Sequence, residues 1–106
     1  MSPLAILNEE AAKLFTLTGG KLLADVTRSQ YNKNSHTLII RAPALAYEFE
    51  VCTILYDPGR PFPCRVSRRS IHTDTANTEE FRATIRNTLQ QQDVATVIQN
   101  LLGQLT

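Results

Sequence analysis

Residues 44–66 read ALAYEFEVCTILYDPGRPFPCRV, and this stretch decides the expected fold. Within residues 44–56 apolar and polar residues alternate, which is typical of a strand with one buried face. The sequence DPGR follows at residues 57–60, where proline presets one central dihedral angle of a turn and glycine tolerates the next. The stretch therefore predicts an antiparallel β-hairpin.

The four-residue loop at 57–60 also predicts the register of this hairpin. Counting outward from the loop places Val51 opposite Val66 and Glu48 opposite Arg69. Apolar residues then face apolar residues, and charged residues face charges of opposite sign, as stable cross-strand pairs require.

The same register separates the two cysteines. Cys52 would face Arg65 on the polar face, whereas Cys64 would share the apolar face with Val66. Side chains on opposite faces of a sheet cannot form a disulfide bond. We therefore predict two free thiols, and the spacing of the cysteines matches no zinc-binding pattern.

Upstream of the hairpin the sequence predicts one helix. Residues 4–17 have apolar residues at helical spacing, Ser2 can cap the N-terminus, and Gly19 with Gly20 can supply a left-handed exit. The predicted buried stripe consists of Leu4, Leu7, Ala11, Leu14 and Phe15. Asn8, Glu9, Glu10 and Lys13 are assigned to the opposite, polar face.

Two further strands are predicted over residues 22–27 and 36–41. The Ala42-Pro43 pair between the second and third strands is interpreted as a tight turn, with a β-bulge as the alternative. A tight turn would place Leu38 and Ile40 on the apolar face, beside Tyr47 and Leu45.

Downstream of the hairpin the sequence predicts a linker and two helices. Residues 70–78 have no period, and Asn77 with Glu80 three residues later forms a capping-box-like helix start. The apolar residues of the first helix are Phe81, Ile85 and Leu89. After a polar break at residues 90–92, Asp93 is predicted to cap a final helix.

These elements predict a single α+β domain over residues 1–106, with an N-terminal helix, a four-stranded antiparallel meander and two C-terminal helices. By order of elements alone, the helix on a meander resembles the cystatin-type two-layer arrangement. No sequence motif supports a family assignment, so the resemblance implies no function.

The overall charge excludes a chain that is basic throughout. Eleven Lys and Arg against ten Asp and Glu give a net charge of +1, so any anion-binding site must be local. The N-terminus lacks the pattern of a signal peptide, and no apolar stretch is long enough to cross a bilayer. We therefore expect a cytoplasmic protein with no membrane partner and no cofactor.

The main candidate binding site is a group of four arginines. Arg60, Arg65, Arg68 and Arg69 lie within ten residues that contain no acidic residue, and His72 follows them. Arginine suits planar recognition of carboxylates and phosphates. The group could bind an acidic protein surface or an anion, or it could be a solvated strand, with Arg69 paired to Glu48.

The sequence also suggests three weaker candidate sites. Cys64 with His72 and Asp74 would form a nucleophilic site, but a thiol on an apolar face is unreactive. His36 could join His72 and Asp74 as metal ligands, but no fourth ligand is evident, so we predict no metal site. Glu48 and Glu50 could act as an acid and base pair, but we expect surface charges.

The final helix has an apolar stripe wider than a single sheet layer requires. Its core positions are Val94, Ile98, Leu101 and Leu105, and Val97 and Leu102 widen it. The stripe predicts a subunit interface in a homodimer or, alternatively, a helix that covers the sheet.

Together these features predict a non-enzymatic accessory protein that binds a protein partner through the arginine-rich hairpin, as a homodimer. The first alternative is a binder of a small anion or nucleic acid through the same arginines. The second is a small enzyme with a pocket between helix and sheet, where Tyr47 and His36 could point.

Overall fold

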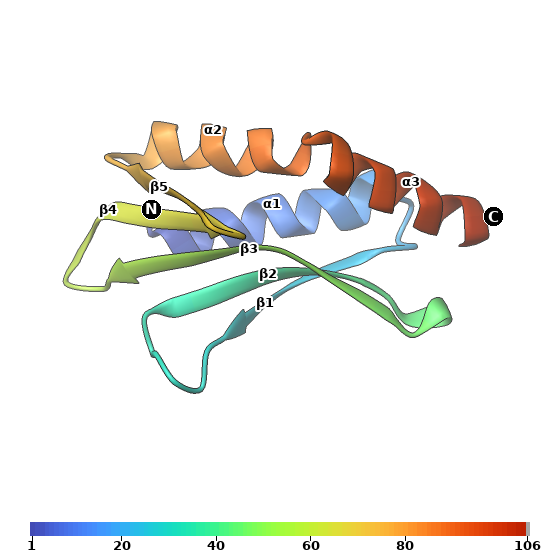
Figure 1. The fold of residues 1–106 in the computed structure, drawn as a ribbon, viewed down its shortest axis with the longest axis horizontal. Coiled ribbons are helices and arrows are strands. Elements are labelled where there is room, and N and C mark those ends of the chain that lie inside the picture. The colour runs from blue at the N-terminus through green and yellow to red at the C-terminus, as the bar shows by residue number, and fades with distance from the viewer. Residues whose placement is uncertain (106) are drawn as a thin grey trace.

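The computed structural model describes residues 1–105, which fold into one helix, a five-stranded sheet and two further helices (Figure 1). The α+β class predicted from the sequence is confirmed, with one strand more than expected. The elements are α1 (Pro3–Leu17), β1 (Leu23–Arg28), β2 (Ser35–Ala42), the 3₁₀ helix η1 (Pro43–Leu45), β3 (Tyr47–Asp57), β4 (Arg60–Arg68), β5 (Ile71–Thr75), α2 (Thr78–Leu89) and α3 (Gln92–Leu105).

The five strands form an antiparallel meander in the order β1-β2-β3-β4-β5, and all three helices lie on one side of it (Figure 1). The core fills the space between the helices and that covered face of the sheet. Its fully buried large side chains include Ile6 and Leu7 from α1, Ile40 and Ile54 from the sheet, and Phe81 and Ile85 from α2. The other face of the sheet has no helix on it, and we call it the open face.

Local sequence signals set the ends of α1 and the start of α2 as predicted. The Ala5 backbone N–H donates to Ser2 Oγ at the N-terminus of α1, and Gly19 and Gly20 have φ values of 64° and 78° after its end. At α2, the Glu80 backbone N–H donates to Asn77 Oδ1 over 2.9 Å.

The buried face of α1 differs from the predicted one. Ile6 is buried together with Leu7 and Ala11, whereas Phe15 is 44% exposed. Glu10, expected on the polar face, is only 5% exposed and lies between α1 and α2.

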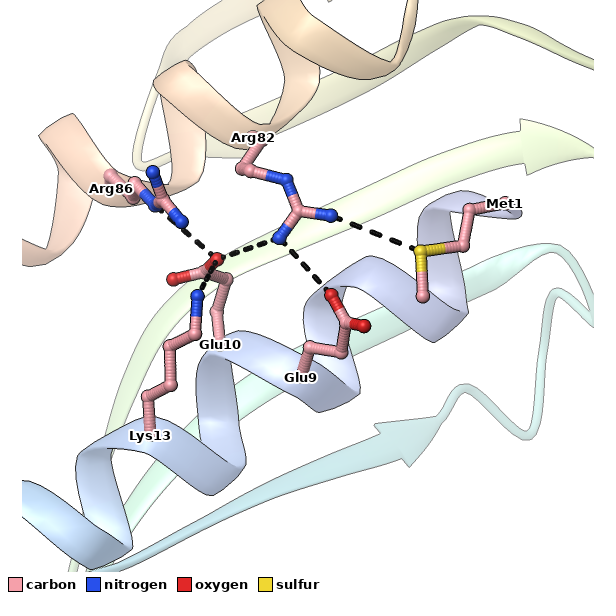
Figure 2. A network of polar contacts seen from close by, with 6 residues as sticks. All are labelled: Met1, Glu9, Glu10, Lys13, Arg82 and Arg86. Carbon is pink, nitrogen blue, oxygen red and sulfur yellow. Dashed lines mark hydrogen bonds and ion pairs between the residues drawn. The ribbon is translucent and has the colours of Figure 1, made fainter.

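Glu10 Oε1 accepts three cationic partners, Lys13 from its own helix and Arg82 and Arg86 from α2, at 3.1–3.3 Å (Figure 2). Arg82 also pairs with Glu9. The two arginines of α2 offset much of the cost of burying this carboxylate, so the contact favours the observed packing of α1 on α2. This network is a structural clamp between the two helices.

The predicted linker contains a strand, β5, so that part of the sequence prediction is wrong. Arg69, with φ 57°, turns the chain after β4, and residues 71–75 then pair with β4. Only Thr75 of this edge strand is buried. A strand with both faces in water has no apolar alternation, so its sequence carries no periodic signal.

The predicted register of β3 and β4 holds only next to the turn. Asp57 pairs with Arg60 as expected, but Leu55 pairs with Arg65, and Val66 pairs with Ile54 instead of Val51. The ladder is irregular at residues 61–63, where Pro61 and Pro63 have no N–H to donate. Arg69 therefore lies beyond the end of β4 and cannot face Glu48.

The expected turn at Ala42-Pro43 is longer than predicted. The chain makes the 3₁₀ turn η1, Ala46 adopts φ 51°, and Tyr47 then pairs with Ala42. Ile40 consequently pairs with Phe49, and not with the predicted Leu45 or Tyr47.

A β-bulge in β3 explains why Cys52 is not on the polar face. Leu38 pairs with Cys52 but Ile39 pairs with Glu50, so Val51 is an extra residue in β3. The extra residue turns Val51 and Cys52 both toward the covered face, where they are buried. Cys64 is buried as predicted, and both thiols are free.

Candidate functional site

The four predicted arginines do not form one patch. Because side chains alternate along β4, Arg65 lies on the open face, while Arg68 lies on the same side as the buried Val66. Arg60 is exposed at the hairpin tip, at the other end of β4. Arg65 is paired with Asp74 across β4 and β5 at 3.0 Å, and this hydrogen bond raises the pKa of Arg65.

Arg68 is the most enclosed of the four, with a side chain 14% exposed. Its Nε donates to the backbone carbonyl of Val51 over 3.0 Å, and its other nitrogens donate to Gln91 and to both carboxylate oxygens of Asp93. The exposed Arg69 also pairs with Asp93, at 3.0 Å. The hydrogen bond from Arg68 is the main cause that lowers the pKa of Asp93.

Asp93 therefore has a different role from the predicted one. Helix α3 begins at Gln92, so Asp93 lies in its first turn, and its carboxylate joins the start of α3 to the end of β4. Two cations share this one carboxylate, and Asp74 neutralises Arg65. The arginine group is largely satisfied within the chain, by acids that are distant in sequence.

His72 belongs to a row of polar side chains on the open face. The row runs across all five strands through register pairs and consists of Thr27, Thr37, Thr53, Ser67 and His72. The hydroxyls of Thr37 and Thr53 lie 3.0 Å apart, and Ser67 Oγ lies 2.7 Å from His72 Nδ1. The sequence did not predict this row, because it depends on the register of all five strands.

The strand β3 has a free edge over half its length. It pairs with β2 from residue 47 to residue 55, but its pairing with β4 starts only at Thr53. Within residues 1–105, residues 47–52 therefore have a strand neighbour on one side only, and we call them the open β3 segment. In Figure 1, β2 and β3 run on toward η1 past the place where β4 and β5 end.

Two grooves border the open β3 segment. One, of about 420 Å³, lies between the start of β3 and α3 and is lined by Leu45, Tyr47, Val97, Asn100, Leu101 and Gln104. The other, of about 260 Å³, is lined by residues 49–53 of β3 and by Ser67, Arg68 and Arg69. The two grooves thus touch β3 at Tyr47 and at residues 49–53.

The other combinations considered from the sequence are not assembled. Cys64 faces the core and its burial raises the thiol pKa to about 12, whereas His72 and Asp74 lie on the open face. His36 is buried beside Tyr56, where desolvation and then Arg28 lower its pKa. No group of three His, Cys, Asp or Glu side chains within residues 1–105 is arranged to hold a metal ion.

The predicted interface residues of α3 are divided between the core and the surface. Val94 and Leu101 are buried in the core of this chain, while Ile98 and Leu105 are partly exposed beside it. The helix thus covers its own sheet, and an interface through its remaining apolar surface stays a prediction. In the described part of the chain, none of the helices has the length and apolar character needed to span a membrane.

Comparisons with protein-family models, with curated proteins and with solved structures find no significant match for this chain.

Proposed function

We propose that this chain is a non-enzymatic module that binds another protein, with the contact at the open β3 segment and at the arginine end of β4. The observation that carries the proposal is the free backbone edge at residues 47–52, bordered by two grooves. Exposed edges are templates for pairing with another chain, so a fold that leaves one between two grooves is suited to hold a partner there.

Two observations favour a protein partner over an anion or a substrate. Arg65, Arg68 and Arg69 are already paired with carboxylates of this chain, which reduces the charge available to phosphates. The thiols are buried with pKa values raised to about 12, which makes them unreactive, and His72 is exposed on the open face. Neither the thiols nor His72 therefore provides a reactive group inside a pocket.

A homodimer through α3 is a second part of the proposal. Beyond Asp93 this helix carries no charged residue, and Ile98, Leu102 and Leu105 are partly exposed. In a two-fold symmetric interface each residue near the axis faces its own copy, so an uncharged helix avoids repulsion between like charges.

The proposal is tested by native mass spectrometry of the protein isolated gently from its own host. We expect the chain to carry an additional polypeptide, which Glu50→Lys in the open β3 segment removes. Arg60→Ala at the opposite end of β4 is the matched control and should retain it. A chain that is bare, that carries only a small molecule, or that loses the polypeptide equally in both variants would contradict the proposal.

A further inference from the structure

We propose that the open β3 segment accepts an extended segment of the partner as an added strand, in which apolar and cationic side chains alternate. This inference rests on the proposed function and deepens it, because it names the chemistry of the partner segment.

The open β3 segment has a backbone edge with which an added strand could form hydrogen bonds. Residues 47–52 are held in extended form by β2, and their other edge has no strand beside it among residues 1–105. Arg68 Nε already donates to the Val51 carbonyl, the place where β4 stops. An added strand would therefore lie beside residues 47–50, in line with β4, and would pair with main-chain groups that now face solvent.

The covered side of the segment selects apolar side chains. Tyr47 and Phe49 pair with the buried Ala42 and Ile40, so both lie on the side of the helices. The 420 Å³ groove continues from Tyr47 to Val97 and Leu101 of α3. Alternate side chains of an added strand would enter this groove, which is apolar along Leu45, Val97 and Leu101 and polar at Asn100 and Gln104.

The open side of the segment selects cationic side chains. Glu48 and Glu50 are exposed there, and Asp25 of β1 lies on the same face. Arg41 is the cation among them, 3.2 Å from Asp25 and 3.7 Å from Glu48. Glu50 thus keeps an acidic surface beside the free edge, and opposite charges on neighbouring strands stabilise a sheet.

Arg68 and Arg69 line the same groove as Glu50, but both guanidinium groups are paired with Asp93. Within residues 1–105 no ion pair joins either arginine to Glu48 or Glu50. The apolar groove reaches β3 at Tyr47, and Glu48 is the next residue along the strand. Neighbouring residues of the edge therefore present an apolar and an acidic surface, as an alternating segment requires.

A second copy of this chain fits the edge poorly. Pairing two copies edge to edge in antiparallel fashion about Phe49 would bring Glu48 of one chain opposite Glu50 of the other. Like charges directly opposite one another destabilise a sheet. The charges therefore favour a different, cationic partner segment over self-pairing.

The test is a titration of the ¹⁵N-labelled full chain, followed by NMR, with two end-blocked heptapeptides. One alternates lysine and valine and the other alternates glutamate and valine. We expect the lysine peptide to shift the amide signals of residues 47–52 and of Val97, and to bind at least about tenfold more tightly than the glutamate peptide. Glu48→Lys with Glu50→Lys should reverse this preference, while Arg60→Glu at the hairpin tip should leave it unchanged.

Other outcomes would overturn the inference. Equal binding of both peptides would refute the charge selection, and shifts confined to the Thr37 and Thr53 region would refute the added strand. Absence of shifts with either peptide at millimolar concentration would refute the site. Failure of the inference is distinguishable from failure of the proposed function, because the polypeptide retained in native mass spectrometry is a separate measurement.

Discussion

The two halves of β3 belong to one strand but have different surroundings. Residues 53–55 pair with both β2 and β4, whereas residues 47–52 lie beside β2 only. In the paired half Ile54 is fully buried, and in the open half Glu48 and Glu50 are exposed. Val51 and Cys52 of the open half are nevertheless buried in the core. A single strand can thus contribute side chains to the core along its length and still leave a free backbone edge along one half.

The boundary between the two halves of β3 is the point where β4 ends, and side-chain contacts of Arg68 and Arg69 hold that end in place. Arg68 takes the Val51 carbonyl that a longer β4 would have paired, and Arg69 then turns the chain into β5. Asp93 holds both arginines from the start of α3. The end of β4 is thus fixed by a contact with a helix that follows much later in the sequence.

The largest expected effect comes from the paired half. Ile54→Ala should lower the free energy of unfolding by about 2–5 kcal/mol, because Ile54 is fully buried and the truncation leaves a cavity. Glu50→Gln in the open half should change it by no more than about 0.5 kcal/mol. Urea denaturation of both variants measures the difference, and similar losses would contradict the burial of Ile54 and the exposure of Glu50.

Arg68→Ala tests whether Arg68 holds the end of β4, and its effect on the free energy of unfolding should be intermediate. It leaves the Val51 carbonyl and Asp93 without their main partner, so we expect a stability loss smaller than that of Ile54→Ala but larger than that of Glu50→Gln. The Arg69→Ala variant, which removes the more exposed partner of Asp93, is the control. A smaller loss in Arg68→Ala than in Arg69→Ala would contradict the role given to Arg68.

The pH dependence of stability adds a smaller effect in the paired half, where His36 pairs with Ile54. Burial, and then Arg28, lower the pKa of His36 in the folded chain, so the unfolded chain binds the proton more readily. The free energy of unfolding should therefore fall as the pH drops from about 6.5 through the folded pKa. His36→Gln should flatten the profile there, and an unchanged profile would show that another group is responsible.

The last prediction concerns the alkylation rates of the two cysteines, one in the open half of β3 and one in β4. Both thiols have pKa values raised to about 12 by burial, so both should resist alkylation at neutral pH in the folded protein. Cys52 lies in the open half and should react faster than Cys64 through local opening. Mass spectrometry of the unfolded, unreduced protein should find two alkylated cysteines, and none would indicate a disulfide bond.

The sequence predicted the elements that carry local signals. The caps at Ser2 and Asn77, the glycine exit after α1 and the turn at residues 57–60 all depend on neighbours in the chain, and all are observed. β5 was missed because both its faces meet water. The bulge at Val51 was not predicted because the expected strand was assumed to alternate strictly. The extra residue places Cys52 on the opposite face from the predicted one.

The candidate site was predictable only in part. Arg68 and Arg69 were identified, but their common partner Asp93 is more than twenty residues away in sequence. No acidic residue lies among residues 60–69, so the ion pairs of these arginines with a distant carboxylate were not predicted. The sequence did not predict the open β3 segment. Its free edge depends on where β4 ends, and the residues of β3 carry no signal for that position.

Amide hydrogen exchange along β3 in the free protein shows whether the backbone edge at residues 47–52 is open. If the edge is open, the amides of residues 47–52 that face away from β2 should exchange quickly. The amides of residues 53–55 should be protected whichever neighbour they face, because β2 lies on one side and β4 on the other. Added lysine and valine heptapeptide should then slow the exchange in residues 47–52 alone. Uniform protection along β3 in the free protein would contradict the claim, because it would show that the edge is already covered.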